Sequence, residues 1–420
     1  MSEIMRAVKG MNDLFADELS TWQKVEKTTA DVFSVYGFTE IRTPILEELG
    51  VFVRGVGEGT DIVDKEMYTL QDRDGKTLCL RPENTASVVR ALIENGKLNP
   101  DSEIKNYYMG PMFRRERPQR GRLRQFHQIG AEYLGVSAPA ADVEVISMLH
   151  DLLTTLGITN LKLAINTLGQ PQERAPYNAA LRAYFQSHFA ELCADCQRRL
   201  EKNTFRILDC KNPKCSLIAD ASPPISDFLQ DESKQHFDAV IEGLTKQSIT
   251  AVVMPRLVRG LDYYTRTVFE FVAETGLGAQ NAVAGGGRYD GLVKNLGGCD
   301  LPGLGFSAGI ERIVLVLQDL AKVQVLTGPQ VTFVYADEPG KQKAFELVAQ
   351  LRKARVRADI DHQSRSVKAQ MRRADRLGAR SVIVLGAREV NEEQAQLKML
   401  ADGTLNLIRL DVSSLLSQIK

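Results

Sequence analysis

The sequence predicts an α+β fold, with a large domain on a mainly antiparallel sheet, a helical insertion and a smaller α/β domain at the C-terminus. Strand-like segments are spread over most of the first 310 residues with few helices between them, which favours antiparallel pairing. Between Gln170 and Lys246 the sequence is polar and helix-leaning, with little strand character. Beyond Pro329, apolar runs alternate with amphipathic helices. The expected domains are therefore 1–325, with an insertion at 170–248, and 329–420.

Periodicity places the elements of the first domain in order. Asp13–Tyr36 is an amphipathic helix with Gly37 as its C-cap, and an extended segment broken by Pro44 follows it. Lys76–Leu80 alternates like a strand, and the residues from Arg81 onward open a helix. Apolar residues spaced for one helix face predict a helix at Asp142–Leu156. Further strand-like segments are Leu161–Ile165, Ile249–Met254, Thr267–Val272 and Asn281–Ala284.

The C-terminal domain alternates strands and helices in a βαβαβ rhythm. Helices are expected at Lys341–Lys353 and Ser366–Leu377, and the second is basic. On that helix Lys368, Arg372 and Arg376 continue a stripe that begins at Arg365. The expected strands are Val331–Tyr335, Ala358–Ile360, Ser381–Leu385, Leu397–Leu400 and Leu405–Leu410.

Composition limits the kinds of partner and compartment. The formal net charge is +0 and the pI is near 7.0, so a polyanionic partner must be bound by local basic surface. The first ten residues lack the apolar region of a secretory signal, and no apolar run is long enough to cross a membrane. The 6 cysteines are scattered in a way that suits a reducing compartment, and we expect the cytoplasm.

The segment Met112–Leu134 is the most informative part of the chain. Pro118 and Gly121 mark a turn between two extended stretches, which predicts a long β-hairpin with an arginine-lined tip. Guanidinium groups suit phosphate oxygens, and an aromatic ring can stack on a base, so this hairpin predicts a site for a polyanionic ligand that carries a ring. One face of the second strand would hold Arg124, Phe126, Gln128, Gly130 and Glu132, and the other Gln125, His127, Ile129 and Tyr133.

Several motifs suggest other functions. The glycine patterns at 55–59 and 303–309 lack the spacing and the preceding strand of a dinucleotide fingerprint, and the sequence contains no Walker A motif. Gly305–Gly309 fits the G-x-S-x-G pattern of serine hydrolases, with Asp361 and His362 downstream. The residues before it are not an apolar strand, as a nucleophile elbow requires, so a serine hydrolase is kept only as an alternative.

The cysteines of the insertion resemble a zinc ribbon in outline. Cys193 and Cys196 form a C-x2-C pair, but Cys210 and Cys215 are spaced more widely than is usual. Free buried thiols are common, so we do not expect a structural zinc, and no metal-binding residue is predicted.

Two further peptides carry charge, aromatic rings and glycines. Arg259–Glu270 mixes charged and aromatic residues before a strand, and Ala284–Gly291 lets the backbone approach a ligand closely. Gly305–Arg312 opens an apolar helix. With the hairpin, these segments give one domain four elements suited to phosphates or rings.

The hairpin resembles motif 2 of the class II aminoacyl-tRNA synthetases. Gly305–Arg312 resembles motif 3, and Tyr36–Glu47 resembles motif 1, the dimer-forming segment. Arg259–Tyr264 and Gly285–Gly291 are similar to the signature peptides of histidyl-tRNA synthetases, and the C-terminal domain is similar to the anticodon-binding domain of that family. The resemblance implies a homodimer that uses ATP with Mg²⁺, histidine and tRNA(His), and no membrane.

The resemblance also implies roles for individual residues. Arg114 would hold the α-phosphate of ATP and Arg259 would approach the reacting carboxylate, so both are candidate catalytic residues. Asn84 departs from the family, which often has glycine there. The expected ATP-binding residues are Arg114, Glu116 near the adenine edge, Arg122 and Arg312 on the outer phosphates, and Phe126 stacked on adenine. The expected histidine-binding residues are Glu83, Thr85 and Gln128 at the α-amino group, and Glu132, Tyr264 and Tyr289 near the imidazole.

The strongest rival is a regulatory paralogue of histidine biosynthesis, which keeps this fold without the activity. Such paralogues typically lack the C-terminal domain and lose signature arginines. This chain keeps Arg114, Arg259 and Arg312, and a complete domain after Pro329. The sequence therefore favours an enzyme that activates histidine with ATP and transfers it to tRNA.

Overall fold

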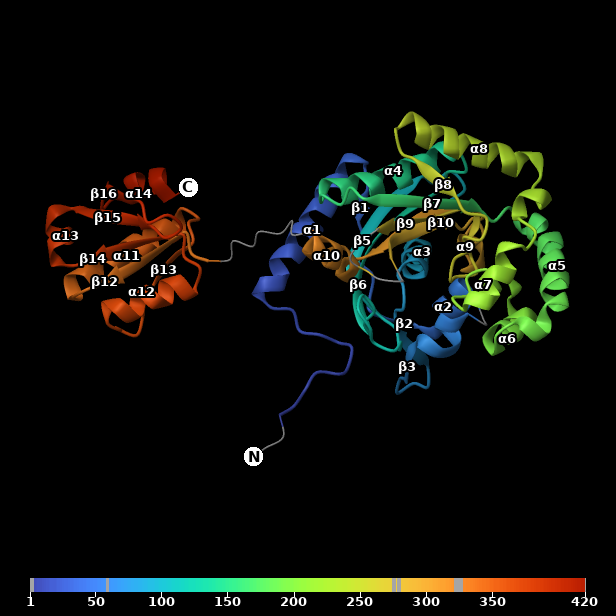
Figure 1. The fold of residues 1–420 in the computed structure, drawn as a ribbon, viewed down its shortest axis with the longest axis horizontal. Coiled ribbons are helices and arrows are strands. Elements are labelled where there is room, and N and C mark those ends of the chain that lie inside the picture. The colour runs from blue at the N-terminus through green and yellow to red at the C-terminus, as the bar shows by residue number, and fades with distance from the viewer. Residues whose placement is uncertain (1–3, 58–59, 274–276, 278–280, 321–327, 420) are drawn as a thin grey trace. The chain divides into compact units, whose positions relative to one another are not determined.

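The computed structural model describes residues 4–57, 60–273, 277, 281–320 and 328–419. The chain forms two compact units, Met1–Val323 and Gln324–Lys420, which differ in the kind of sheet they contain (Figure 1). No helix in the described ranges is long and apolar enough to cross a membrane.

The first unit is built on an eight-stranded sheet with the order β1-β5-β6-β11-β10-β9-β7-β8. Among the described strands, only the outer pairs of this sheet, β1 with β5 and β7 with β8, are parallel, so the prediction of a mainly antiparallel sheet is confirmed. In sheet order, the strands are β1 Thr39–Glu40, β5 Ile104–Phe113, β6 Gln125–Leu134, β11 Gly303–Gly309, β10 Ala282–Arg288, β9 Thr265–Ala273, β7 Leu161–Thr167 and β8 Ala251–Val253.

Four helices pack on one face of this sheet over the main hydrophobic core. The ring of Phe33 on α1 lies 5.5 Å from that of Tyr107 on β5 and 5.8 Å from that of Phe306 on β11, each edge to face. Helix α8 lies beside α4 in Figure 1, so the last helix of the expected insertion belongs to the core of the sheet. The helices are α1 Ala16–Val35, α4 Pro139–Thr155, α8 Asp231–Lys246 and α10 Ile310–Asp319.

A second core lies on the opposite face and joins the sheet to α3 and to the helical segment that precedes α8. This segment is helical, as the sequence predicted. A small sheet of order β2-β4-β3 stands apart from the large one. These elements are α2 Leu49–Val56, β2 Leu46–Glu48, β3 Tyr68–Gln71, β4 Thr77–Leu80, α3 Thr85–Glu94, α5 Pro171–Ser187, α6 Ala194–Lys202, α7 Pro213–Asp220 and α9 Leu292–Asn295.

The glycine-rich segments Ala282–Arg288 and Gly303–Gly309 form central strands of the large sheet, and the strand predicted at Asn281–Ala284 extends to Arg288. A Cβ on Gly286 would lie 2.1 Å from the carbonyl oxygen of Gly305, and a Cβ on Gly305 would lie 2.1 Å from Glu132 Oε2. Only glycine fits at these contacts. Because β11 runs from Gly303 to Gly309, Ser307 lies in the middle of a strand and not on the sharp turn of a nucleophile elbow. This removes the basis for a serine hydrolase.

The second unit has a five-stranded sheet of order β13-β12-β14-β15-β16. Strands β13, β12 and β14 are parallel, and β15 and β16 continue the sheet in antiparallel fashion. The predicted strands and the first two helices are confirmed, whereas α13 and α14 were not predicted. The elements are β12 Val331–Tyr335, α11 Glu338–Lys353, β13 Ala358–Ile360, α12 Val367–Arg376, β14 Ser381–Leu385, α13 Ala387–Glu392, β15 Gln394–Met399, β16 Leu405–Arg409 and α14 Val412–Ile419.

Candidate active site

A cavity of about 620 Å³ lies in the first unit, where the sheet meets the start of α3 and the segment around Arg259. Its lining brings together residues that are far apart in the sequence. Among the predicted site residues, those that line it are Glu83, Thr85, Arg114, Arg122, Gln128, Arg259, Tyr264 and Arg312. Those outside the lining are Glu116, Phe126, Glu132 and Tyr289.

The predicted hairpin is present and holds Arg114 at the cavity. Strands β5 and β6 pair antiparallel up to Phe113 and Gln125, and the backbone N–H of Arg114 donates to Arg124 O over 2.9 Å. The side chain of Arg114 donates through Nε to Pro82 O at 2.9 Å, and its guanidinium carbon lies 5.3 Å from the ring centre of Phe126. The ring and the cation are therefore adjacent, as a nucleotide site needs.

The alternation predicted for β6 is confirmed. Gln128 lines the cavity, whereas His127 faces the helical layer, where its ring meets that of Trp22 edge to face at 4.9 Å. The buried Oε1 of Gln128 has no hydrogen-bond partner among the described residues. An acceptor of this kind suits a ligand that donates, such as an ammonium group.

Arg122 and Arg312 concentrate positive charge beside Arg114. Arg122 Nη1 pairs with Glu116 Oε2 at 2.7 Å, so Glu116 is placed by the hairpin itself. Burial lowers the pKa of Arg312, and the like charge of Arg122 lowers it further. A polyanion bound here would relieve that repulsion.

The start of α3 forms the opposite wall. Glu83 is buried, and its carboxylate accepts hydrogen bonds from the backbone N–H groups of Thr85 (2.7 Å) and Ala86 (3.0 Å). Burial raises the pKa of Glu83, and these bonds oppose that shift. Asn84 instead accepts hydrogen bonds from Thr43 and Arg81 through Oδ1, at 2.7 and 3.1 Å, and lies outside the lining.

Glu132 lies beneath this wall and not in the lining. Its carboxylate accepts a hydrogen bond from Thr85 Oγ1 at 2.7 Å and another from the hydroxyl of Tyr289. Burial raises its pKa to about 8, although both hydrogen bonds oppose the shift. Thr85 thus connects a buried, readily protonated carboxyl to the cavity.

Arg259 projects across β10 because that strand has no side chain at Gly285. A Cβ there would lie 2.6 Å from Arg259 Nη1. The guanidinium pairs with Glu270 on β9, and its carbon lies 5.8 Å from the ring centre of Tyr264. Burial lowers the pKa of Arg259, but Glu270, Tyr264 and Tyr263 together raise it by more, so the pKa is raised overall.

Sequence analysis missed several residues at this site. Glu270, Tyr108, Tyr263 and Ser307 also line the cavity. Glu270 ends the peptide that the sequence singled out and could have been found as the acid that pairs with Arg259. Tyr108 comes from β5, where nothing but its register with Gly130 marks it.

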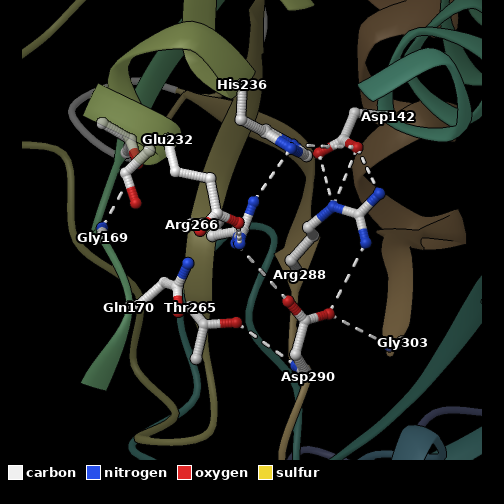
Figure 2. Close-up of polar contacts among 12 residues, drawn as sticks. Asp142, Gly169, Gln170, Glu232, His236, Thr265, Arg266, Arg288, Asp290 and Gly303 are labelled. Atoms are coloured by element: carbon white, nitrogen blue, oxygen red, sulfur yellow. Dashed lines mark hydrogen bonds and ion pairs between the residues drawn. The ribbon is translucent and has the colours of Figure 1, made fainter. Parts of the chain in front are cut away.

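Arg288, in the second signature peptide, has a structural role (Figure 2). It is fully buried, and its Nη2 lies 2.6 Å from Asp142 Oδ2 on α4, while Nη1 lies 3.5 Å from Asp290. His236 on α8 faces the same carboxylate, with Nε2 3.4 Å from Oδ2. Burial raises the pKa of Asp142, but these two partners lower it overall. The network fixes β10 against both helices.

Comparison with known proteins agrees with this geometry. The family model described as histidyl-tRNA synthetase matches residues 10–313, and the model described as anticodon binding domain matches 330–420. A relative from Syntrophotalea carbinolica, named histidine–tRNA ligase, is 47% identical over 404 residues, which are 96% of each chain. The apo crystal structure of histidyl-tRNA synthetase from S. aureus is 34% identical, has a TM-score of 0.81, and is matched over 98% of this chain and 99% of that one.

A second solved structure bears on the rival. It is described as an ATP phosphoribosyltransferase regulatory subunit/histidyl-tRNA synthetase from Bacillus halodurans, with 22% identity and a TM-score of 0.66 over 91% of this chain and 99% of that one. At that identity it shows a shared fold and no more.

Proposed function

The chain belongs to the histidyl-tRNA synthetase family, and from this premise we propose how its cavity carries out the reaction of the family. The protein is an ATP-dependent ligase. It converts histidine and ATP to histidyl-adenylate and pyrophosphate, and then transfers histidine to the 3′ end of tRNA(His). The regulatory paralogue is set aside because the close relatives are ligases over almost their whole length.

On the ATP side, Arg114 holds the α-phosphate, and Phe126 stacks on adenine with Glu116 at the adenine edge. Arg122 and Arg312 hold the outer phosphates. The adjacency of Arg114 and Phe126, and the repulsion between Arg122 and Arg312, support this arrangement. Glu116 pairs with Arg122, so it also aims that guanidinium.

On the histidine side, Glu83, Thr85 and Gln128 receive the α-amino group. Gln128 supports this role with its unpaired acceptor, and Glu83 with a buried carboxylate. Tyr264 lies in the lining, where it can meet the imidazole directly. Glu132 and Tyr289, which are hydrogen-bonded to each other below Thr85, supply the polar contact that discriminates an imidazole from an apolar ring.

Arg259 acts where the two substrates meet. The histidine carboxylate attacks the α-phosphorus in line, and pyrophosphate leaves, so negative charge moves across the phosphoryl oxygens. A guanidinium held by Glu270 is already oriented for that charge and needs little reorganisation. With Arg114 it forms the catalytic pair.

Mg²⁺ enters as part of the MgATP substrate. The carboxylates that line the cavity are Glu83, Asp209 and Glu270. Glu83 accepts backbone N–H groups, Asp209 pairs with Lys211, and Glu270 pairs with Arg259. These engaged groups do not suit a resident ion, whereas ATP phosphates bind Mg²⁺ themselves.

The remaining assignments concern assembly and tRNA. We propose a catalytic domain at 1–325 with a helical insertion at 170–248, and an anticodon-binding domain at 329–420. The separation of the compact units near residue 323 supports the first boundary, and the family match from residue 330 supports the last.

On α12, Lys368, Arg372 and Arg376 are exposed and suit phosphates. Motif 1 supports a homodimer, and the free thiols of the described residues support the cytoplasm.

The observation that carries this proposal is that one cavity holds both the Arg259–Tyr264 peptide and the arginines of the hairpin. The test is ATP–pyrophosphate exchange with MgATP and each amino acid in turn. Exchange is expected with histidine alone. Exchange with another amino acid, or with none, would overturn the assignment.

A further inference from the structure

Four of the cysteines meet at one point of the helical segment. Their sulfur atoms all lie within 4.8 Å of one another. Two come from the start of α6, one follows the short helix Thr204–Ile207, and one comes from α7. This cysteine cluster is Cys193, Cys196, Cys210 and Cys215.

The spacing of the sulfurs fits a metal better than a disulfide. Cys193 Sγ and Cys210 Sγ are 3.9 Å apart, about twice the length of an S–S bond of about 2.05 Å. Zinc–sulfur bonds of about 2.3 Å in a tetrahedron place the sulfurs about 3.8 Å apart. An ion could therefore be held after shifts of about an ångström or less.

The backbone already supports thiolate ligands. Cys193 is the N-cap residue of α6, and its N–H group donates to Cys215 Sγ at 3.2 Å. Hydrogen bonds from backbone N–H groups to ligand sulfurs orient them and stabilise their negative charge. Three members of the cluster are buried, so a charged ligand set would be shielded from water.

The wide second spacing, which argued against zinc in the sequence, has a local explanation. Asn212 caps α7, and its Oδ1 accepts a hydrogen bond from Lys214 N at 3.0 Å. Pro213 occupies the first helical position. This turn brings Cys215 back beside Cys210, so the extra residues do not separate the two sulfurs.

We propose that the cysteine cluster binds one Zn²⁺ as a structural site with four thiolate ligands. Thiolates in a closed tetrahedral arrangement select zinc over harder ions and leave no open position for chemistry. This differs from the expectation from the sequence, that no structural zinc is present.

The site holds a segment that touches the active site. Between Cys196 and Cys210, the side chain of Arg206 donates to Arg259 O at 3.3 Å, and Asn203 donates to Asp262 Oδ1 at 2.8 Å. Leu208, in the same segment, lines the cavity. On the proposed function, the ion acts as a positioning element for the peptide that contains Arg259.

The first test is the metal content of the full-length protein, purified under reducing conditions without a metal-affinity tag. Elemental analysis is expected to find about one zinc per chain. Cys196→Ala should lower the zinc content at least about tenfold. Cys79→Ala, which changes an equally buried cysteine in another hydrophobic core, should leave the zinc content unchanged. Cys193→Ala and Cys299→Ala form a second matched pair, because both cysteines are half-buried.

Cobalt substitution tests the ligands directly, even where a variant has lost stability. Co²⁺ added to the stripped, reduced protein should give the charge-transfer and ligand-field absorption of a tetrahedral thiolate complex. Cys196→His should retain binding with a changed spectrum, because three thiolates and one imidazole also form a zinc ligand set. The proposal would be overturned if the reduced protein took up neither Zn²⁺ nor Co²⁺. It would also be overturned if Cys193 and Cys210 formed a disulfide instead of a metal site, or if the bound metal were iron.

The positioning role has a separate readout. Stripped protein that stays folded by circular dichroism should lose pyrophosphate-exchange kcat, and Zn²⁺ should restore it. Unchanged exchange without metal would remove the positioning role while the measured stoichiometry stands. Absence of exchange with zinc bound would instead count against the proposed function.

Discussion

Replacing Glu132 with glutamine tests the proposed imidazole contact. The carboxyl is buried and engages Thr85 at 2.7 Å and the Tyr289 hydroxyl. Glutamine keeps the shape but removes the ability to carry charge. We expect it to weaken the binding of histidine and to leave the binding of ATP almost unchanged, since Phe126 and the arginines lie further along the hairpin.

The size of the effect follows from the type of hydrogen bond. Because the buried carboxyl keeps its proton at neutral pH, the bond is one between neutral groups and contributes about 0.5–1.5 kcal/mol, which corresponds to about 2–13-fold in Kd for histidine. Calorimetric titration of each ligand measures it. Glu103→Gln is the matched control, because Glu103 also accepts a tyrosine hydroxyl, that of Tyr133 at 2.5 Å, but outside the cavity. Equal losses for histidine and ATP would refute the role of Glu132.

The same variant tests the raised pKa of Glu132. The folded protein holds this proton up to a pH of about 8, whereas the free side chain releases it near 4.5. The contribution of this bound proton to the free energy of unfolding is thus fully present below pH 4.5, and it is lost as the pH rises to about 8. Between about pH 5 and pH 8 this is worth up to about 4 kcal/mol, at about 1.4 kcal/mol per pH unit. Urea unfolding of Glu132→Gln should show a smaller fall in stability over that range, and an unchanged fall would mean that Glu132 does not hold the proton.

Three further predictions concern other parts of the chain. Arg259→Ala should lower the kcat of adenylation about 10²–10³-fold while the fold survives, and a rise in the KM for ATP alone would show that Arg259 only binds the ground state. Reversing the charge of Lys368 and Arg372 together should weaken tRNA binding and flatten its salt dependence without changing pyrophosphate exchange, and unchanged tRNA affinity would move the contact elsewhere. The protein should be a homodimer by light scattering at micromolar concentration, and a fully active monomer would contradict this.

Much of the fold could be predicted because its periodic patterns are strong. The ends of Val331–Tyr335 and Ser381–Leu385 agree residue for residue with the predicted strands, since each is a short, mainly apolar run that follows a polar residue. The hairpin was found from the turn at Gly121, whose φ is +73°. Strand β11 and the part of β10 beyond Ala284 were missed because glycine is a poor strand former, and only tertiary contacts require it there.

The candidate site was predicted less completely. The alternation of β6 separated Gln128 from His127 correctly, because period-2 geometry is local. That Glu132 lies behind Thr85, and that Glu270 holds Arg259, depends on how helix α3 and the segment around Arg259 pack against the sheet. The convergence of Cys193 with Cys210 likewise depends on how short helices turn, which residue spacing alone does not show.

The most direct test of the whole account is to trap the intermediate. The protein is mixed with histidine, Mg²⁺ and ATP labelled at the α-phosphate, with pyrophosphatase and without tRNA, and the products are separated. Labelled histidyl-adenylate should accumulate on the protein and disappear, with formation of histidyl-tRNA, when tRNA(His) is added. Labelled ATP that stays intact, or adenylate that forms but never passes to tRNA, would contradict the account.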